Sequence, residues 1–164
     1  MTAGKAPPGA ERGGEIKVVC TNRKARHLYH ILDSWEAGLI LTGTEVKSLR
    51  AGHATMTDAY AALQGMEMIL HNLHINPYEQ GNRYNHQPTR PRKLLLHRRE
   101  LSKLVGRTVE KGLTLVPLQV YFRGGWAKVE IALARGKKIY DKRRDMADRE
   151  MKRDVERSLK ERSR

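Results

Sequence analysis

The feature of this sequence that most restricts its fold is a pair of alternating apolar runs on either side of Gly124-Gly125. Side chains that alternate with period two place one face of a strand on a core, and a Gly-Gly pair suits the tight turn of a β-hairpin. The expected core-facing side chains are Val116, Leu118, Val120 and Phe122 in the first run, and Ala127, Val129, Ile131 and Leu133 in the second. Pro117 cannot donate a hydrogen bond to a neighbouring strand, so it predicts an edge position or a bulge.

Other segments of the chain also read mainly as strands. A second hairpin is expected from 59–63 to 66–70, turning at Gln64-Gly65, and weaker strand patterns occupy 16–21, 29–32 and 39–41. Apolar residues at helical spacing predict a helix over 98–109 that Gly106 breaks, and a short helix is possible over 45–50 before Gly52. The predicted fold class is mainly β, a small closed OB-type barrel with one to three accessory helices and a basic C-terminal tail, because closure removes exposed strand edges.

Composition divides the chain into three regions. Residues 1–14 are rich in Gly and Pro and have no apolar run, so we expect a flexible leader that is neither a signal peptide nor an anchor. Residues 15–134 hold nearly all the apolar runs and are expected to form the barrel. Residues 135–164 form the tail, with 13 basic and 7 acidic side chains.

The tail allows two interpretations. Ala147, Met151, Val155 and Leu159 recur every four residues and would form a thin apolar stripe on a helix. Such a stripe buries too little to hold a helix on the barrel, so the tail is expected to be disordered when free. It is either a solubilising segment or a segment that becomes helical on an RNA surface, and the combination of stripe and charge favours the second interpretation.

The charge of the chain indicates its partner. Lys and Arg number 32 against 18 Asp and Glu, a net charge of +14 that attracts polyanions. Nucleic acid is the commonest polyanion, and each neutralised phosphate releases counterions. An anionic membrane would require a basic amphipathic helix of better quality than any found here, and no segment approaches the roughly 20 apolar residues of a membrane span. Cys20 is the only cysteine, which excludes an intramolecular disulfide and a cysteine-based zinc site and indicates a reduced, cytoplasmic setting.

Motifs for catalysis are missing from the sequence. It contains no GxxxxGK[ST] or GxGxxG phosphate loop, no HExxH and no GxSxG. His71 and His74 lack the further ligands that a zinc site needs, and nothing around Asp33 and Glu36 indicates a dry pocket for acid–base chemistry. We therefore expect no enzyme activity, no cofactor and no metal.

Three basic clusters favour RNA as the partner. Residues 22–27 hold three cations, an amide and an imidazole, and residues 90–99 hold five basic side chains. In the loop 76–91, the rings of Tyr78, Tyr84 and His86 alternate with Arg83 and Arg90. Planar rings beside guanidinium groups suit the unstacked bases of folded RNA. Each cluster alone could be a solvated surface, but together with the tail they predict a polyanion partner, with RNA preferred over DNA on fold grounds.

Five stretches of the chain resemble one known family, that of the SsrA-binding proteins, also called small protein B. They are NRKARH at 22–27, WEAGL at 35–39, GTEVKSLRAG at 43–52, KLLLHRREL at 93–101 and GKKIYDKR at 136–143. The resemblance implies an OB-type barrel that binds the tRNA-like domain of transfer–messenger RNA in place of the missing anticodon arm. It also implies delivery of this RNA to stalled ribosomes for trans-translation, in which incomplete chains are tagged for degradation.

The resemblance also implies roles for individual residues. An RNA-binding face is expected from Asn22, Lys24, Arg26, His27, Glu36 and Leu95, to which the basic cluster at 90–99 adds Arg92 and Lys93. Glu36 should organise neighbouring cations or accept a hydrogen bond from a base edge or a ribose hydroxyl. Glu45, Lys47 and Arg50 are expected to shape the barrel instead of reading RNA.

In the tail, the resemblance links the motif at 136–143 with the ribosomal decoding centre. The tail residues expected to act there are Gly136, Lys137, Lys138, Asp141, Lys142, Arg143, Arg149, Met151, Lys152 and Arg153. Asp141 could also serve as the N-cap of a tail helix.

The expected partners are transfer–messenger RNA, the small-subunit decoding centre and messenger channel, and elongation factor Tu indirectly through the charged RNA, with no membrane. The alternative function is that of another translation-associated OB protein, such as a ribosomal protein or an initiation-type factor. The motif at 136–143 followed by a charged helical tail distinguishes the two, because an ordinary OB module need not carry it.

Overall fold

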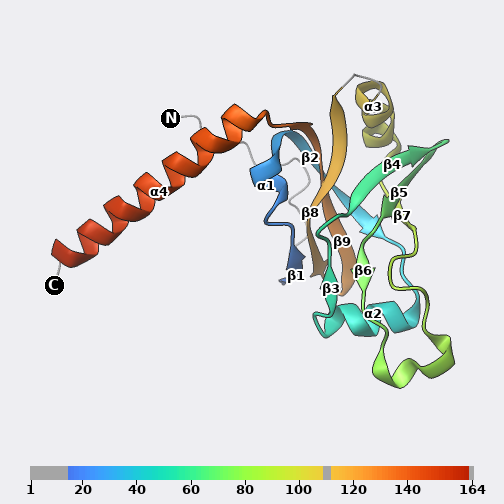
Figure 1. Ribbon diagram of the computed structural model, residues 1–164. Helices are drawn as coiled ribbons and strands as arrows, with labels where there is room; N and C mark the ends of the chain where they lie inside the picture. Colours follow the sequence, from blue (N-terminus) through green and yellow to red (C-terminus); the bar gives the residue numbers. More distant parts are fainter. Residues whose placement is uncertain (1–14, 109–111, 163–164) are drawn as a thin grey trace.

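The computed structural model describes residues 15–108 and 112–162 (Figure 1). Over these residues the fold is mainly β, a large antiparallel sheet accompanied by several helices. The elements in chain order are β1 (Ile16–Thr21), α1 (Ala25–Leu28), β2 (Tyr29–Leu39), α2 (Gly43–Arg50), β3 (Ala54–Thr55), β4 (Tyr60–Gln64), β5 (Glu67–His71), β6 (His74–Ile75), the 3-10 helix η1 (Glu79–Tyr84), β7 (Arg92–Leu95), α3 (Arg98–Thr108), β8 (Leu113–Arg123), β9 (Trp126–Gly136) and α4 (Ile139–Arg162).

The large sheet has seven strands in the order β1-β8-β4-β5-β7-β2-β9, and β8 also pairs with β9. A small second sheet joins β3 and β6. One main apolar core receives side chains from β2, β4, β5, β7, β8 and β9, and it includes the fully buried Leu49 of α2 and Leu104 of α3. The two helices therefore belong to the same packed body as the strands.

The β8–β9 hairpin is confirmed, with Arg123 opposite Trp126 and a turn at Gly124-Gly125. Both glycines have a positive φ, +55° and +82°, which a tight hairpin turn requires and which other residues adopt only at a cost. The bulge expected near Pro117 is also confirmed, because the register shifts between Pro117 and Gln119.

The bulge changes which side chains of β8 face the main core. Leu115, Val120 and Phe122 lie there, whereas Val116 and Leu118 belong to a second, smaller apolar cluster. The expectation that all four even-numbered side chains from 116 to 122 share one face was therefore wrong. An inserted residue shifts the period-two alternation by one, so residues before and after a bulge face opposite sides.

Two further sequence predictions need correction. The strand predicted at 29–32 is the start of one long strand, β2, which continues to Leu39, so Ile40 and Leu41 lie beyond any strand. The polar middle of β2 pairs with its neighbours because Ser34 and Glu36 do not enter the core. Gly106 does not break α3, which continues to Thr108. A glycine inside a helix costs about 1 kcal/mol, and the burial of Leu104 in the main core offsets that cost. Residue 109, the expected end of this helix, lies outside the described residues.

The other local predictions agree with the structure. The β4–β5 hairpin is confirmed, although its turn lies at Gly65-Met66, one residue later than expected. The short helix before Gly52 is α2, and it begins at Gly43 because Thr42 and Glu45 form a capping box there.

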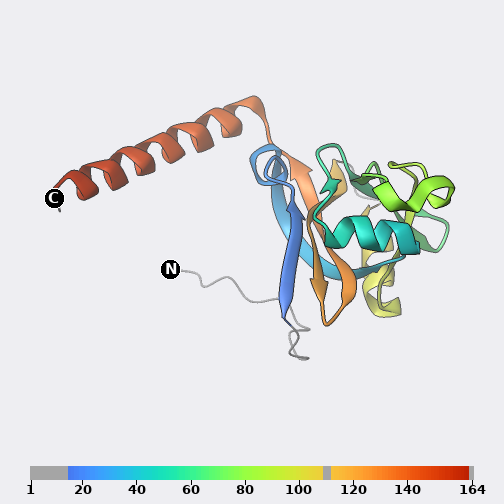
Figure 2. The same cartoon turned by 90° about the horizontal axis from the view of Figure 1, so that it is seen from below.

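Helix α4 projects away from the sheet (Figures 1 and 2). Its apolar side chains Met151, Val155 and Leu159 are 54–63% exposed, so the stripe predicted for the tail packs against nothing in the described structure. The disorder expected for the free tail stays a prediction, and the leader 1–14 lies outside the described residues. In the part of the chain that is described, none of the helices has the length and apolar character needed to cross a membrane.

Candidate nucleic-acid interface

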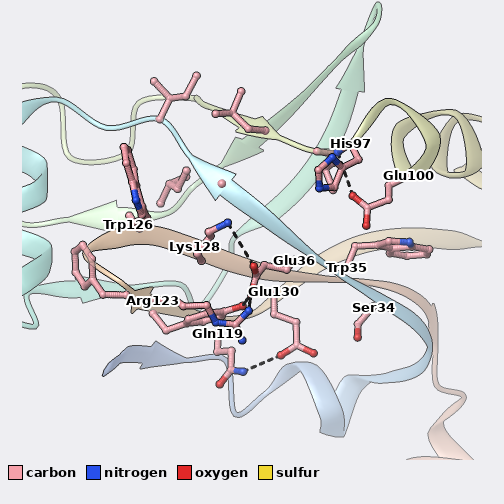
Figure 3. Close-up of a pocket in the computed structure, with 18 of the residues that line it drawn as sticks. Ser34, Trp35, Glu36, His97, Glu100, Gln119, Arg123, Trp126, Lys128 and Glu130 are labelled. Carbon is pink, nitrogen blue, oxygen red and sulfur yellow. Dashed lines mark hydrogen bonds and ion pairs between the residues drawn. The ribbon is translucent and has the colours of Figure 1, made fainter. Parts of the chain in front are cut away.

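Three paired strands, β2, β9 and β8, gather polar side chains on the face turned away from the main core. The register places Glu36 opposite Glu130, and Glu130 opposite Gln119, while Lys128 lies opposite Tyr121. We call this surface the Glu36 face and define it by six residues: Glu36, Gln119, Tyr121, Arg123, Lys128 and Glu130 (Figure 3).

Glu36 is the centre of an ionic network on this face. Its carboxylate accepts a hydrogen bond from the Tyr121 hydroxyl and lies 2.8 Å from Arg123 Nη1 and 3.4 Å from Lys128 Nζ (Figure 3). Burial alone would raise the pKa of Glu36, but the Tyr121 hydrogen bond and the charges of Lys128 and Arg123 outweigh it and lower this pKa. Glu36 thus holds two cations in place, the first of the two roles expected for it. Its contact with a base or ribose stays a prediction.

A broad groove with a volume of about 1550 Å³ runs over this face. Its lining also includes residues of the segment after β7 and of α3 (Figure 3). The Trp126 indole is 76% exposed and Leu95 is 54% exposed, so apolar surfaces flank the ionic network. Leu95 approaches β2 closely at Gly38, where an added Cβ would lie 3.3 Å from the Leu95 Cβ. Cations beside an exposed ring can hold phosphates and a stacked base together.

The cluster at 22–27 forms the turn into α1. Asn22 is only 9% exposed, and its side chain donates to the Pro117 carbonyl at 3.2 Å and accepts from the Ala25 amide at 3.1 Å. It therefore shapes the turn and does not present its amide to a ligand, which corrects its expected place on the RNA-binding face. Lys24 and Arg26 are exposed, and His27 is half-buried with an Nδ1 atom that has no hydrogen-bond partner among the described residues.

Strand β7 separates the residues of the second basic cluster. Side chains alternate along it, so Arg92 and Leu94 point inward while Lys93 and Leu95 point outward. Arg92 is fully buried, and its guanidinium group donates to Glu45 and to the carbonyl oxygens of neighbouring residues. The expectation that Arg92 binds RNA was therefore wrong, because no RNA atom can reach it. Lys93 is exposed and pairs with Glu67.

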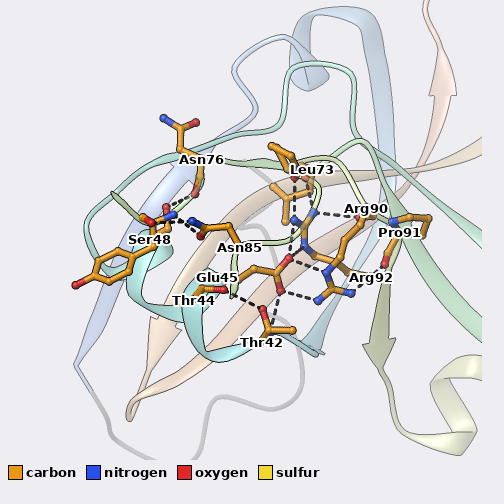
Figure 4. A network of polar contacts seen from close by, with 12 residues as sticks. Thr42, Thr44, Glu45, Ser48, Leu73, Asn76, Asn85, Arg90, Pro91 and Arg92 are labelled. Atoms are coloured by element: carbon orange, nitrogen blue, oxygen red, sulfur yellow. Dashed lines mark hydrogen bonds and ion pairs between the residues drawn. The ribbon is translucent and has the colours of Figure 1, made fainter. Parts of the chain in front are cut away.

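Arg92 belongs to a buried ionic network around Glu45, which is 6% exposed (Figure 4). The Glu45 carboxylate accepts from Arg90 Nε at 2.8 Å, from Arg92 Nε at 3.0 Å and from the Thr42 amide at 2.9 Å. Burial alone would raise the pKa of Glu45, but the hydrogen bonds from Arg90 and Thr42 and the charge of Arg92 hold it at about 2. The network ties α2 to the loop 76–91 and to β7, which confirms the expected shaping role of Glu45.

The root of the tail is attached to α1. The Lys137 amide donates to the Leu28 carbonyl at 2.9 Å, and Lys137 Nζ donates to the Arg26 carbonyl at 2.9 Å and to the Asp145 carboxylate. This attachment was not foreseen from the sequence, because it joins residues that are more than a hundred positions apart. It orients the start of α4 relative to the exposed cations of α1.

Asp141 does not cap α4, contrary to one of its two expected roles. The helix begins at Ile139, so Asp141 lies in its first turn, where the unpaired backbone amides favour a negative charge. The Asp141 carboxylate lies 3.6 Å from His30 Nε2.

The remaining tail residues are distributed along the root and the length of α4. Gly136 ends β9, Lys138 is exposed before the helix, and the helix carries Lys142, Arg143, Arg149, Met151, Lys152 and Arg153. None of these lines the groove. Apart from the buried Asn22 and Arg92, the predicted site residues thus fall into four groups: Glu36 and Leu95 in the groove, Lys24, Arg26 and His27 at α1, Lys93 on the outer side of β7, and the tail.

Sequence reasoning missed five of the six residues of the Glu36 face, and it also missed Trp126, which lines the same groove. The five are Gln119, Tyr121, Arg123, Lys128 and Glu130. The alternation of β8 and β9 was recognised, but only their apolar faces were used. The polar side chains at the outward-facing positions of these two strands were the signal that could have identified the missed residues. Among residues 15–108 and 112–162, no group of three or more His, Cys, Asp or Glu side chains is placed to hold a metal ion.

Comparison with known proteins identifies similar sequences over nearly the whole chain. Residues 19–161 match the family model described as SmpB protein. The SsrA-binding protein of Pelotomaculum thermopropionicum is 58% identical over 149 residues, covering 91% of this chain and 97% of that protein. The SsrA-binding protein of Desulforudis audaxviator is 60% identical over 144 residues, covering 88% and 94%.

A solved structure is also similar. It is described as "tmRNA-SmpB: a journey to the center of the bacterial ribosome", and one of its chains is 55% identical to this chain. The TM-score is 0.63, and the match covers 73% of this chain and 85% of the other.

Proposed function

The chain belongs to the SmpB protein family, and on this basis we propose that it is an RNA-binding adaptor for transfer–messenger RNA. It binds this RNA and delivers it to stalled ribosomes for trans-translation, the rescue and tagging of incomplete chains. The observation that carries the proposal is the extent of the family match, which includes the Glu36 face and most of α4. Another translation-associated OB protein would not need to match through the tail.

We propose that the Glu36 face and the exposed cations of α1 bind the tRNA-like domain. Three features support this: the exposed Lys24 and Arg26, the cations held by Glu36, and the apolar surfaces of Leu95 and Trp126 along the groove. Phosphates would lie against the cations, and unstacked bases against the flat apolar surfaces. Asn22 contributes by shaping the α1 turn.

We propose that the large sheet is a closed barrel of the OB type. Consecutive pairings run from β8 to β4, β5, β7, β2 and β9, and the pairing of β9 with β8 returns to the starting strand. Strand β1 adds to the outside of this circuit. Such barrels bind RNA on a strand face, which is where the Glu36 face lies.

We propose that residues 135–164 reach the decoding centre and the messenger channel. The attachment of Lys137 to α1 supports this, because it joins the start of the tail to the surface expected to hold the RNA. Elongation factor Tu would meet the protein only through the charged RNA, and the protein would act in the cytoplasm as an adaptor without a catalytic step of its own.

The test is to purify the protein with an affinity label from a bacterial lysate and to identify the RNA that is recovered with it, in parallel with an Arg123→Ala/Lys128→Ala variant. We expect one dominant structured RNA, transfer–messenger RNA, on the wild-type chain and at least tenfold less on the variant. In a reconstituted translation reaction stalled on a truncated message, the degradation tag should then be added to the incomplete product only when the wild-type protein is present. Recovery of mixed ribosomal RNA without enrichment of transfer–messenger RNA would contradict the proposal.

A further inference from the structure

One side chain, that of Lys137, joins the end of α1 to the start of α4, where the tail leaves the body (Figures 1 and 2). Lys137 Nζ donates to the Arg26 carbonyl at 2.9 Å and to the Asp145 carboxylate, and the Lys137 amide donates to the Leu28 carbonyl at 2.9 Å. We call these four residues, Arg26, Leu28, Lys137 and Asp145, the Lys137 clamp. We propose that RNA bound to α1 closes the Lys137 clamp, and that the closed clamp starts the tail helix and fixes its direction.

On one side, the Lys137 clamp completes the C-terminal end of α1. This helix has only four residues, so it has little stability of its own. The last carbonyl groups of a helix have no partner within it, and a cation beside them is favourable. In α1, the carbonyls of Arg26 and Leu28 find their partners in the ammonium group and the amide of Lys137, whose side chain is only 9% exposed. The conformation of α1 and the position of Lys137 Nζ therefore depend on each other.

On the other side, the same ammonium group holds the second turn of α4. Asp141 and Asp145 are four residues apart, so they lie on one face of the helix. That face is turned to the body, because Asp141 lies 3.6 Å from His30 Nε2 of β2 and Asp145 accepts from Lys137. The hydrogen bond from Lys137 lowers the pKa of Asp145 against the effect of burial, and the charges of Lys137, Arg149 and His30 lower it further. Two acidic side chains thus attach the first two turns to the body.

The start of a helix is the part that costs most to form. Ordering the first turn fixes three residues for one hydrogen bond and has an equilibrium factor of about 10⁻³, whereas each later residue adds its own hydrogen bond. A clamp that holds residues 139–145 therefore supplies the nucleus from which α4 can extend to Arg162. Because the same contacts attach this nucleus to α1 and β2, they also set the direction in which the helix grows.

The Lys137 clamp is weak enough for RNA to control it. The Asp145 side chain is 36% exposed, and ion pairs at the surface contribute little to stability, so the free protein populates both the open and the closed clamp. Lys24 and Arg26 are exposed, and phosphates that hold their side chains also fix the backbone of α1 and its carbonyl groups. RNA does not compete with Asp145 for Lys137, because the Lys137 side chain is nearly buried. By linkage, the closed clamp strengthens RNA binding by the factor by which RNA favours the closed clamp.

This inference rests on the proposed function, because it takes RNA to bind at α1, and it adds an order of events. RNA binding prepares the first two turns of the tail, and the ribosome then extends the helix through residues 146–162. The inference also assigns a role to Asp145, which acts by positioning the tail and not by contact with RNA.

The test measures backbone Cα chemical shifts of the tail in the full, isotope-labelled chain, alone and saturated with a transcript of the tRNA-like domain. We expect RNA to raise the helical population of residues 139–144 at least about twofold and to leave residues 150–162 unchanged. Asp145→Asn should remove most of this increase and weaken RNA binding in a filter assay about threefold, the size expected for a surface ion pair. Asp148→Asn makes the same change of charge about one turn later on α4 and should behave as the wild type.

A second variant, Lys137→Met, separates the clamp from effects within α4, because Lys137 lies before the helix and its replacement leaves the helix propensity of α4 unchanged. It should lower the helical population of residues 139–144 as much as Asp145→Asn does, and the double variant should lose no more than either single variant, since both remove the same contact. Unchanged chemical shifts in β8 would show that each variant is folded. An additive loss in the double variant would mean that Asp145 acts only through the helix dipole, and it would overturn the proposal.

The RNA titration distinguishes this inference from the proposed function. Binding of the RNA to the wild-type chain without a change at residues 139–144 would contradict the inference alone. Failure of the RNA to bind the wild-type chain would contradict the inference and the proposed function together.

Discussion

Glu36 links a phenol, a guanidinium group and an ammonium group, so its removal changes more than the charge of the surface. We expect Glu36→Ala to weaken binding of transfer–messenger RNA about tenfold, because Arg123 and Lys128 lose the group that orients them and a hydrogen bond to a charged group contributes about 1.5 kcal/mol. Filter binding at two salt concentrations measures this. Charge alone predicts the opposite, since the substitution raises the net charge by one.

Glu130 provides a matched control for Glu36. It is a carboxylate on the same face, but its hydrogen bond goes to Gln119 and not to a cation. Glu130→Ala adds the same charge and should bind the RNA as tightly as the wild type or slightly more tightly. If Glu36→Ala also binds more tightly than the wild type, Glu36 is not a recognition residue.

Glu45 should make stability depend on pH in the acid range. Its pKa of about 2 in the folded chain lies below the value of about 4.3 in an unfolded chain, so its contribution is complete above pH 4.3 and is lost as the pH falls through 2. We expect Glu45→Gln to lower the free energy of unfolding by about 3 kcal/mol at pH 7, because Arg92 is left buried without a counter-charge. The variant should also lose stability less steeply between pH 4 and about 2 than the wild type.

Urea denaturation at a series of pH values measures both effects. Glu67→Gln is the control, because Glu67 forms an ion pair with Lys93 at the surface, and such pairs contribute about 0–1 kcal/mol. Equal loss of stability in the two variants would show that burial of the Glu45 network has no special effect.

Among the elements, α4 is the one whose helical state is expected to depend on its surroundings. Lys137 and His30 contact the first two turns of α4, but the apolar stripe farther along the helix is exposed and packs against nothing in the described structure. Ordering such a polar helix costs more free energy in chain entropy than the burial of so thin a stripe would return. We propose that residues 142–162 are largely disordered in the free protein and become helical on the ribosome. Backbone chemical shifts of the free protein test this directly.

The double substitution Met151→Pro/Val155→Pro should abolish tagging and leave binding of transfer–messenger RNA unchanged. Proline costs about 3 kcal/mol or more inside a helix and little in a disordered chain. The variant should therefore lose only the helical form of the tail on the ribosome. Tagging rates in a reconstituted reaction measure the effect. Arg149→Lys/Arg153→Lys keeps the charge and the helix and should be milder, whereas normal tagging by the proline variant would mean that the tail acts only as a flexible polycation.

At the level of the whole molecule, we expect the body to bind transfer–messenger RNA without α4. The groove and the exposed cations of α1 all lie outside that helix. The chain should be cut after Lys138, because a cut after Ala134 would remove the last residues of β9 and the attachment of Lys137 to α1. Affinity in a gel-shift assay should stay within about tenfold, since phosphate contacts contribute nearly independently, while tagging stops.

The control for this truncation is the thermal unfolding of the body, which should be unchanged because α4 packs little against the sheet. Loss of RNA binding by a truncated chain that is still folded would contradict the assignment of the RNA to the body. It would place the main RNA contacts on α4 instead.

Some of the fold could be predicted because the responsible signals are local. The β8–β9 hairpin follows from alternation and a glycine pair, and the bulge follows from Pro117, whose missing N–H has the same effect in any strand. The RNA partner and the family could be predicted from charge and from five short stretches. The length of β2 could not be predicted, because pairing with distant strands determines it. The continuation of α3 beyond Gly106 could not be predicted either, because burial of Leu104 in the core determines it.

The residues of the candidate site also divide into those that the sequence predicted and those that only the structure revealed. The sequence by itself placed Lys24 and Arg26 in a basic cluster, and its family resemblance assigned Glu36 to the RNA-binding face. Only the tertiary structure decided that Arg92 is buried against Glu45 and that Asn22 faces inward, while Arg123, Lys128 and Trp126 join Glu36 on one face. Charge and alternation belong to the local chain, whereas the partner of a polar side chain and its exposure to water depend on residues brought together from distant positions by packing.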